Sequence, residues 1–152
     1  MTIRVSMKRL KNGLVLGRLL PAYLVLGVLK HVVPLRWLAC WTWYPPSGPR
    51  DCEAERRLAA TVFRLSQLIA LGDRDCLQRS LLLYRVLSRA GAQPTLVVGF
   101  QRSNGQILGH AWVTVDGRPV LEPEVNLARF APALSFGFEG APLLPLSDFR
   151  AA

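Results

Sequence analysis

The chain has 152 residues, 51% of them hydrophobic, which is enough apolar material for the core of one domain and excludes intrinsic disorder. Its formal net charge of +9 comes from the first third, because residues 1–50 hold eight Lys or Arg and no acid, whereas residues 51–152 hold eleven basic and ten acidic residues. Such a segment is attracted to phosphate, to an anionic membrane or to an acidic protein. Because aromatic and basic residues are not interleaved in it, we predict no nucleic-acid partner.

Residues 1–46 are predicted to form a basic, apolar helical appendage. The apolar stretch over residues 13–33 is interrupted by Arg18 and Lys30, so it is too short for a membrane span and a poor secretory signal. Packing of this segment on the rest of the chain is favoured over the alternative, peripheral contact with a membrane. We expect its helices to break at prolines, namely Pro21, Pro34 and Pro45-Pro46.

Residues 47–152 are predicted to form one α+β domain. After a Pro-rich linker, Asp51 can cap a first helix, and a second helix runs from Cys76 to a stop at Gly91. Three strands follow, over residues 94–100, 107–115 and 119–122, with turns at Asn104-Gly105 and Asp116-Gly117. Two helices before an antiparallel meander define an α+β fold. Beyond Asn126 we expect irregular structure draped over the sheet.

The three cysteines are Cys40, Cys52 and Cys76. An odd number without CxxC or zinc-like His spacing predicts no metal site and no cofactor, and it fits a reducing compartment. Cys40 and Cys52 are interpreted as ordinary buried thiols or as spectator thiols, because free cysteine behaves as a small apolar residue.

Cys76 is the candidate nucleophile and His110 its candidate base. A helix N-terminus lowers the pKa of a cysteine and offers a backbone N–H to an oxyanion, and Cys76 lies in a first turn. The other histidine, His31, lies in the appendage beside Lys30 and is interpreted as a surface or packing residue. His110 lies in mid-strand on the same face as Trp112. A helix-start Cys with a strand His predicts nucleophilic catalysis.

The acid that orients His110 is ranked by hairpin geometry. Asp116 lies at the turn, about 20 Å along the strand, which is too far. A two-residue turn at Asp116-Gly117 would put Glu122 on the face of the sheet opposite to His110. A three-residue loop instead brings Glu122 to the same face as His110 and places Glu124 directly opposite His110. Glu122 is the first choice and Glu124 the second. Four residues flank the nucleophile and have two possible interpretations, as substrate contacts or as a solvated helix start: Asp73, Arg74, Asp75 and Gln78. Gln78 or Trp112 is a candidate for further oxyanion or wall contacts.

The segments Cys76-Leu-Gln-Arg-Ser-Leu81 and Gly109-His-Ala-Trp-Val113 resemble the transglutaminase-like leader peptidases of lasso peptide biosynthesis. Pro34-Leu-Arg-Trp-Leu38 is similar to the N-terminal part of that family. The resemblance implies a papain/transglutaminase-like core and a Cys-His-Asp triad, with Cys76 and His110 matching and Glu122 standing where the family usually has Asp. It further implies a stand-alone cytoplasmic peptidase.

The function expected from this resemblance is removal of the leader from a lasso precursor peptide, before an asparagine-synthetase-like cyclase forms the macrolactam. The precursor and a separate leader-recognition protein would be its partners. Two alternatives stay open: an acyltransferase or transglutaminase that uses the same triad, and a non-catalytic adaptor of a peptide-maturation complex. Contact with the inner face of the membrane is a further expectation for the basic appendage.

Overall fold

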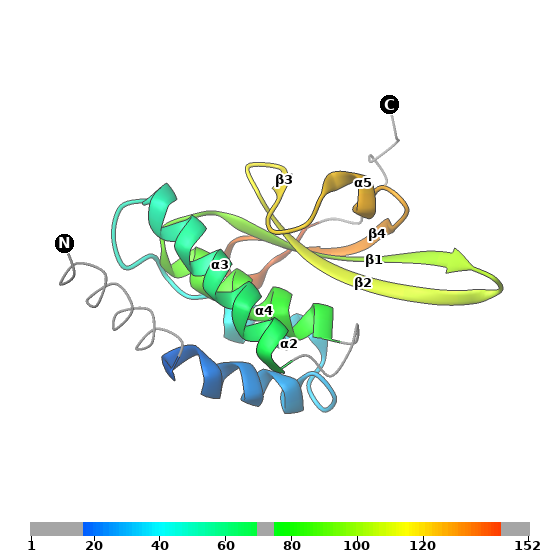
Figure 1. The fold of residues 1–152 in the computed structure, drawn as a ribbon, viewed down its shortest axis with the longest axis horizontal. Coiled ribbons are helices and arrows are strands. Elements are labelled where there is room, and N and C mark those ends of the chain that lie inside the picture. The colour runs from blue at the N-terminus through cyan, green and yellow to red at the C-terminus, as the bar shows by residue number, and fades with distance from the viewer. Residues whose placement is uncertain (1–16, 70–74, 144–152) are drawn as a thin grey trace.

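The computed structural model describes residues 17–69 and 75–143, and it shows helices that precede a five-stranded antiparallel sheet of order β3-β2-β1-β4-β5 (Figure 1). The predicted α+β class is confirmed. The helices are one over residues 17–29, α2 (Leu35–Thr42), α3 (Cys52–Ile69), α4 (Cys76–Arg89), α5 (Glu124–Leu127) and the short 3-10 helix η2 (Phe138–Gly140). The strands are β1 (Pro94–Ser103), β2 (Gln106–Val115), β3 (Arg118–Pro119), β4 (Ala131–Phe136) and β5 (Pro142–Leu143).

The N-terminal helices pack on α4. Tyr23 and Leu38 are buried in one hydrophobic cluster with Leu81 and Leu87 of α4. The helix over residues 17–29 continues through Pro21, so the predicted break there is wrong, and burial of its apolar side compensates for the missing N–H. The break at the second proline is confirmed, since Pro34 is the N-cap of α2. Core residues thus lie on both sides of residue 46. The predicted division of the chain into an appendage, residues 1–46, and a domain, residues 47–152, stays a prediction.

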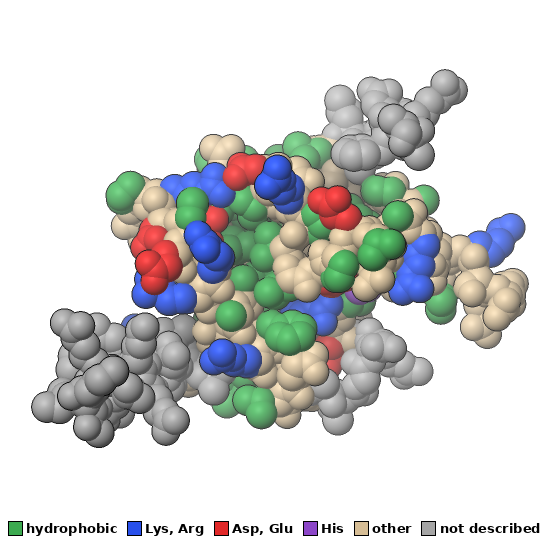
Figure 2. All heavy atoms as spheres, turned by 45° about the horizontal axis from the view of Figure 1, so that its top comes forward, with side chains coloured by type: hydrophobic (Ala, Val, Ile, Leu, Met, Phe, Trp, Pro, Cys, Tyr) green, Lys and Arg blue, Asp and Glu red, His purple; other side chains and the backbone are tan. Residues whose placement is uncertain are grey.

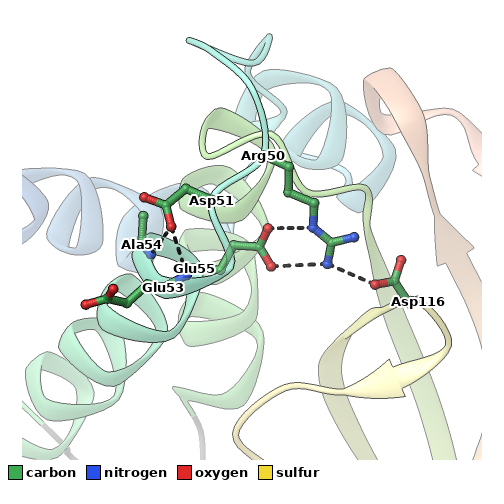
Figure 3. A network of polar contacts seen from close by, with 6 residues as sticks. All are labelled: Arg50, Asp51, Glu53, Ala54, Glu55 and Asp116. Atoms are coloured by element: carbon green, nitrogen blue, oxygen red, sulfur yellow. Dashed lines mark hydrogen bonds and ion pairs between the residues drawn. The ribbon is translucent and has the colours of Figure 1, made fainter.

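The start of α3 is fixed by polar contacts that reach the sheet (Figure 3). Asp51 caps the helix as predicted, because its Oδ1 accepts hydrogen bonds from the N–H groups of Glu53 and Ala54 at 2.9 and 3.0 Å. The neighbouring Arg50 donates to both oxygens of Glu55, at 2.7 and 3.3 Å, and to Asp116 at 2.8 Å. Asp116 belongs to the turn between β2 and β3, so Arg50 joins the helical layer to that hairpin.

Both hairpin turns have two residues. In the β2–β3 turn, Val115 pairs with Arg118, while Asp116 and Gly117 take left-handed φ values of 52° and 75°. Positive φ at both central residues defines the turn that suits the twist of a two-residue hairpin, and Asp-Gly tolerates it. The three-residue loop favoured from the sequence is therefore wrong, although the meander itself is present.

The C-terminal part contributes two strands where irregular structure was expected. β4 pairs antiparallel with β1, with Leu96 opposite Phe136, and β5 pairs with β4. Residues 131–136 lack a clean alternation, and their pairing is stabilised by burial of Ser135 and Phe136 at one end of the strand. The last nine residues of the expected tail lie outside the described residues.

The two faces of the sheet are covered unequally. α4 and the N-terminal helices pack against Leu96, Val113 and Phe136 on one face. On the other face, the described residues form a small cluster of Val97, Trp112, Leu127 and Phe130. Figure 2 shows part of the molecule's surface with hydrophobic side chains between scattered basic and acidic ones. The site described next lies where β2, between these two layers, meets the start of α4.

Candidate active site

Cys76 is the first residue of α4, as the sequence predicted, and its side chain is half-buried. The preceding residue, Asp75, makes no capping hydrogen bond to α4 and instead accepts one from Lys30 Nζ at 3.0 Å. Burial alone would raise the pKa of the Cys76 thiol, but hydrogen bonding to His110, the N–H groups of Ala111 and Leu77, and the charge of the imidazole outweigh it. The net effect lowers the pKa below that of an ordinary thiol and favours the thiolate.

His110 lies in the middle of β2, opposite Gly99 of β1. Its Nε2 lies 2.6 Å from Glu122 Oε2, which leaves Nδ1 as the ring nitrogen for Cys76. Hydrogen bonds to Cys76 and then to Glu122 raise the pKa of His110 to about 9, against the opposing effect of burial. The pair therefore favours thiolate and imidazolium, the forms needed for attack and for proton donation.

The imidazole of His110 is held by aromatic rings. Phe130 stacks on it with ring centroids 5.0 Å apart, and Trp112 lies 6.1 Å away at an interplanar angle of 20°. Trp112 fits because Gly99 on the neighbouring strand has no Cβ, and one built there would lie 2.8 Å from the indole. Trp112 thus packs beside His110, and its suggested oxyanion or wall contact with a substrate stays a prediction.

Glu122 reaches His110 by a route that the sequence did not reveal. β3 ends at Pro119, one further hydrogen bond joins Val120 N–H to Val113 O, and Leu121 then takes a left-handed φ of 72°. The chain thereby leaves the edge of β2. Strand alternation therefore no longer decides on which face of the sheet Glu122 lies. The residue was thus chosen from an incorrect register, and the bend at Leu121 is what brings it to His110.

Glu122 also pairs with Arg79, which the sequence analysis missed. Arg79 Nη2 lies 2.5 Å from Glu122 Oε1, so the two carboxylate oxygens bind different partners. Burial would raise the pKa of Glu122, but the hydrogen bond and charge of His110, with the charge of Arg79, lower it overall. Arg79 follows Cys76 by three residues on α4, and this helical spacing was the signal that could have identified it.

The other candidate acids lie elsewhere. Glu124 opens α5 with an exposed side chain, and within the described residues His110 pairs with Glu122 and not with Glu124. Asp116 is bound to Arg50, away from His110. Asp73 and Arg74 lie outside the described residues, so their suggested substrate contacts stay predictions.

Gln78 does not face the nucleophile, so an oxyanion contact from its side chain is not supported. Its amide is buried, donates to Tyr23 O at 2.7 Å and accepts from Lys30 at 3.1 Å. A Cβ at Gly27 would lie 2.9 Å from this amide, so the glycine leaves it room. With the Lys30–Asp75 ion pair, these contacts tie the start of α4 to the N-terminal helix.

The nucleophile helix is also tied to β2. Ser80 Oγ, one turn after Cys76, donates to Ala111 O at 2.9 Å, and Ala111 is the residue directly after His110. Both groups are buried. This bond sets the distance between the first turn of α4 and the strand that carries the base.

A cleft of about 780 Å³ opens over these groups. It is lined by Ser66, Gln67, Asp75, Cys76, Arg79, Gln101, Leu108, Gly109, His110, Glu122, Asn126, Arg129 and Phe130. Cys40 and Cys52 are exposed thiols and His31 is an exposed surface residue. In the described ranges no cluster of His, Cys, Asp or Glu could hold a metal ion.

Comparisons with known proteins assign the architecture to a family. Residues 22–135 match the model of the Transglutaminase-like superfamily. Neither a curated protein nor a solved structure matches the chain. Among helices of the described residues, none has the length and apolar content to cross a membrane.

Proposed function

Because the chain belongs to the transglutaminase-like superfamily, we propose that it is a cysteine peptidase that removes the leader from a lasso precursor peptide. The observation that carries the peptidase assignment is the continuous contact from Cys76 through His110 and Glu122 to Arg79, all of which line one cleft. The lasso leader as substrate rests on the sequence resemblance around Cys76 and His110. Both parts are tested below.

The proposed reaction is acyl transfer to water. The Cys76 thiolate attacks the carbonyl carbon of the leader–core peptide bond, and backbone N–H groups of the first turn of α4 would donate hydrogen bonds to the oxyanion. His110 gives its proton to the leaving amine of the core, and a thioester to the leader remains on Cys76. Water then attacks the thioester as His110 takes its proton, and the free leader acid and the thiolate are released.

Glu122 and Arg79 act on His110 rather than on the peptide. Glu122 accepts the hydrogen bond from Nε2 and so holds the ring with its other nitrogen toward Cys76. Arg79 keeps the Glu122 carboxylate ionised and holds its second oxygen. In this proposal Glu replaces the Asp usual in the resembling family, and it reaches His110 directly after the bend at Leu121.

Two other functions use the same structure. An acyltransferase or transglutaminase would differ only in the acceptor, an amine instead of water. A non-catalytic adaptor would keep the fold without using the thiol. The lowered pKa of Cys76 and the open cleft beside it favour an enzyme over the adaptor.

The proposed partners are the precursor peptide, a separate leader-recognition protein and an asparagine-synthetase-like cyclase, with a cytoplasmic location. The N-terminal helices offer a surface for a protein partner or for an anionic membrane, because Leu24, Val28 and Trp41 are 52, 67 and 57% exposed. Residues 1–50 add eight basic side chains and no acidic one. Sedimentation with anionic vesicles at low salt distinguishes a membrane partner from a protein partner, and absence of binding contradicts membrane contact.

The decisive experiment uses a lasso precursor peptide identified from the genes that neighbour this one, with the leader-recognition protein added. Mass spectrometry should show release of leader and core by the unmodified chain and none by Cys76→Ala. The matched control is Cys40→Ala, because the Cys40 thiol is exposed and is not among the residues that line the cleft. Undiminished processing by Cys76→Ala overturns the mechanism, and no processing by the unmodified chain overturns the substrate.

A further inference from the structure

The outer edge of β2, which faces away from β1, is only partly paired. The two-residue turn makes Ser103 and Gln106 a pair, so the backbone groups of Gln106 and of every second residue after it point toward β1. The backbone groups of the alternate residues, from Ile107 to Val115, point outward. Because buried backbone N–H and C=O groups are nearly always hydrogen-bonded, we identified the partner of each outward-pointing residue in turn.

The outward positions nearest the β2–β3 turn are occupied. The chain after the turn pairs with two of them, and the first turns of α4 occupy the third. These contacts are Val115 with Arg118, Val113 O with Val120 N–H, and Ala111 with Ser80 Oγ and the Cys76 sulfur.

The two remaining positions, Ile107 and Gly109, have no hydrogen-bond partner within the part of the chain that the structure describes. Both residues are exposed, Ile107 at 69%. The hairpin arm that carries them extends beyond the helical layer (Figure 1). An unpaired strand edge of this kind is a template for an added strand.

This open edge is continuous with the catalytic cleft. Leu108 and Gly109 line the same cleft as Cys76. Residues 106–109 include no charge and no proline, the features with which exposed edges usually avoid pairing. Gly109 presents bare backbone, which lets another backbone approach closely.

We propose that the substrate peptide binds as an added strand on this edge, with its backbone hydrogen-bonded to Gly109 and Ile107. The proposal rests on the peptidase function and adds the binding mode of the substrate. Outward groups repeat every second residue, about 6.6 Å, so a strand paired with Gly109 and Ile107 continues toward Ala111, where Cys76 lies. One side of the scissile bond is thus held extended along the arm, and its recognition comes from main-chain groups.

The first test removes the outward N–H at one position. Ile107→Pro deletes a donor that takes no part in pairing with β1, and Ile107→Val is the matched control that keeps the N–H and the branched side chain. With the precursor peptide, we expect KM to rise about three- to tenfold for Ile107→Pro with kcat nearly unchanged, and both constants to stay within about twofold for Ile107→Val. A circular-dichroism melt verifies that both variants fold.

The second test leaves the protein unchanged. A series of precursor peptides, each N-methylated at one backbone position near the scissile bond, is cleaved by the unmodified chain. We expect KM to rise at every second position on one side of the bond, because only alternate N–H groups of an added strand face β2.

These outcomes separate the binding mode from the function. If the unmodified chain processes the precursor but Ile107→Pro leaves KM unchanged or the N-methyl series shows no alternation, the binding mode is wrong while the peptidase function stands. If the edge instead joins two copies of this chain, light scattering shows a dimer that Ile107→Pro dissociates without a change in KM, which also overturns the proposal. Absence of processing by the unmodified chain contradicts the function itself.

Discussion

The two faces of the sheet differ in how much covers them. The helical face buries a continuous cluster that includes Leu82, Tyr84 and Leu87 of α4, each at most 1% exposed. The opposite face is covered by a cluster of four, in which Phe130 is only half-buried. Cys76 comes from the first layer, while Glu122 and Phe130 come from the loop and strand region of the second. Most of the stability is thus assigned to the helical face, whereas the site draws residues from both faces, and this division can be tested.

The largest effect is expected at Glu122. Glu122→Gln keeps the shape but loses the charge that stabilises the imidazolium, so kcat should fall by about 10²–10⁴. Glu124→Gln is the matched control, because its side chain is exposed at the start of α5. Equal activity of the two variants in the precursor assay would show that Glu122 does not orient His110.

A pair of alanine variants compares the faces directly. Leu87→Ala opens a cavity in the helical layer, far along α4 from Cys76, and should cost about 2–5 kcal/mol in the free energy of unfolding. Phe130→Ala should cost less stability, because the ring is only half-buried, and should lower kcat by loosening His110. Urea unfolding and the precursor assay measure both quantities. A larger stability loss for Phe130→Ala would contradict the division between the faces.

The smallest effect concerns pH. The pKa of His110 is raised to about 9, so its protonated form, which donates to the leaving amine, is lost as pH rises through about 9, and kcat/KM should fall there. The same sign holds for stability: the contribution of His110 is complete below its unfolded pKa near 6.5 and disappears through about 9. Glu122→Gln removes a cause of the raised pKa, so the alkaline limb should move to lower pH.

Alkylation of the three thiols independently tests whether His110 activates Cys76. At pH 6, Cys76 should react with iodoacetamide faster than Cys40 and Cys52, and His110→Gln should abolish the difference. Peptide mapping by mass spectrometry provides all three rates from one sample. Equal slow labelling of the three thiols would favour the adaptor.

Local patterns in the sequence were sufficient for much of the fold. The cap at Asp51, the helix that starts at Cys76 and the two Gly-containing turns all follow from short-range chemistry and are present. β4 could not be predicted, because its pairing depends on β1, about 35 residues earlier, and its own residues do not alternate.

The candidate site shows the same limit. The positions of Cys76 and His110 in their elements follow from helix and strand periodicity. The route of Glu122 depends on a left-handed φ at Leu121, a residue type that gives no warning of such a bend. Phe130 was missed because its contact with His110 joins distant segments, and the spacing of Arg79 from Cys76 gives no sign of its partner Glu122, 43 residues later.

The contacts between the N-terminal helix and the start of α4 limit how the molecule can be divided. The Pro-rich linker invites production of a shorter fragment that begins at residue 47. Such a fragment would leave the amide of Gln78 and the carboxylate of Asp75 without Tyr23 and Lys30, beside Cys76, and would expose the apolar side of α4. A protein engineer who wants a shorter version of the chain should therefore retain the helix over residues 17–29.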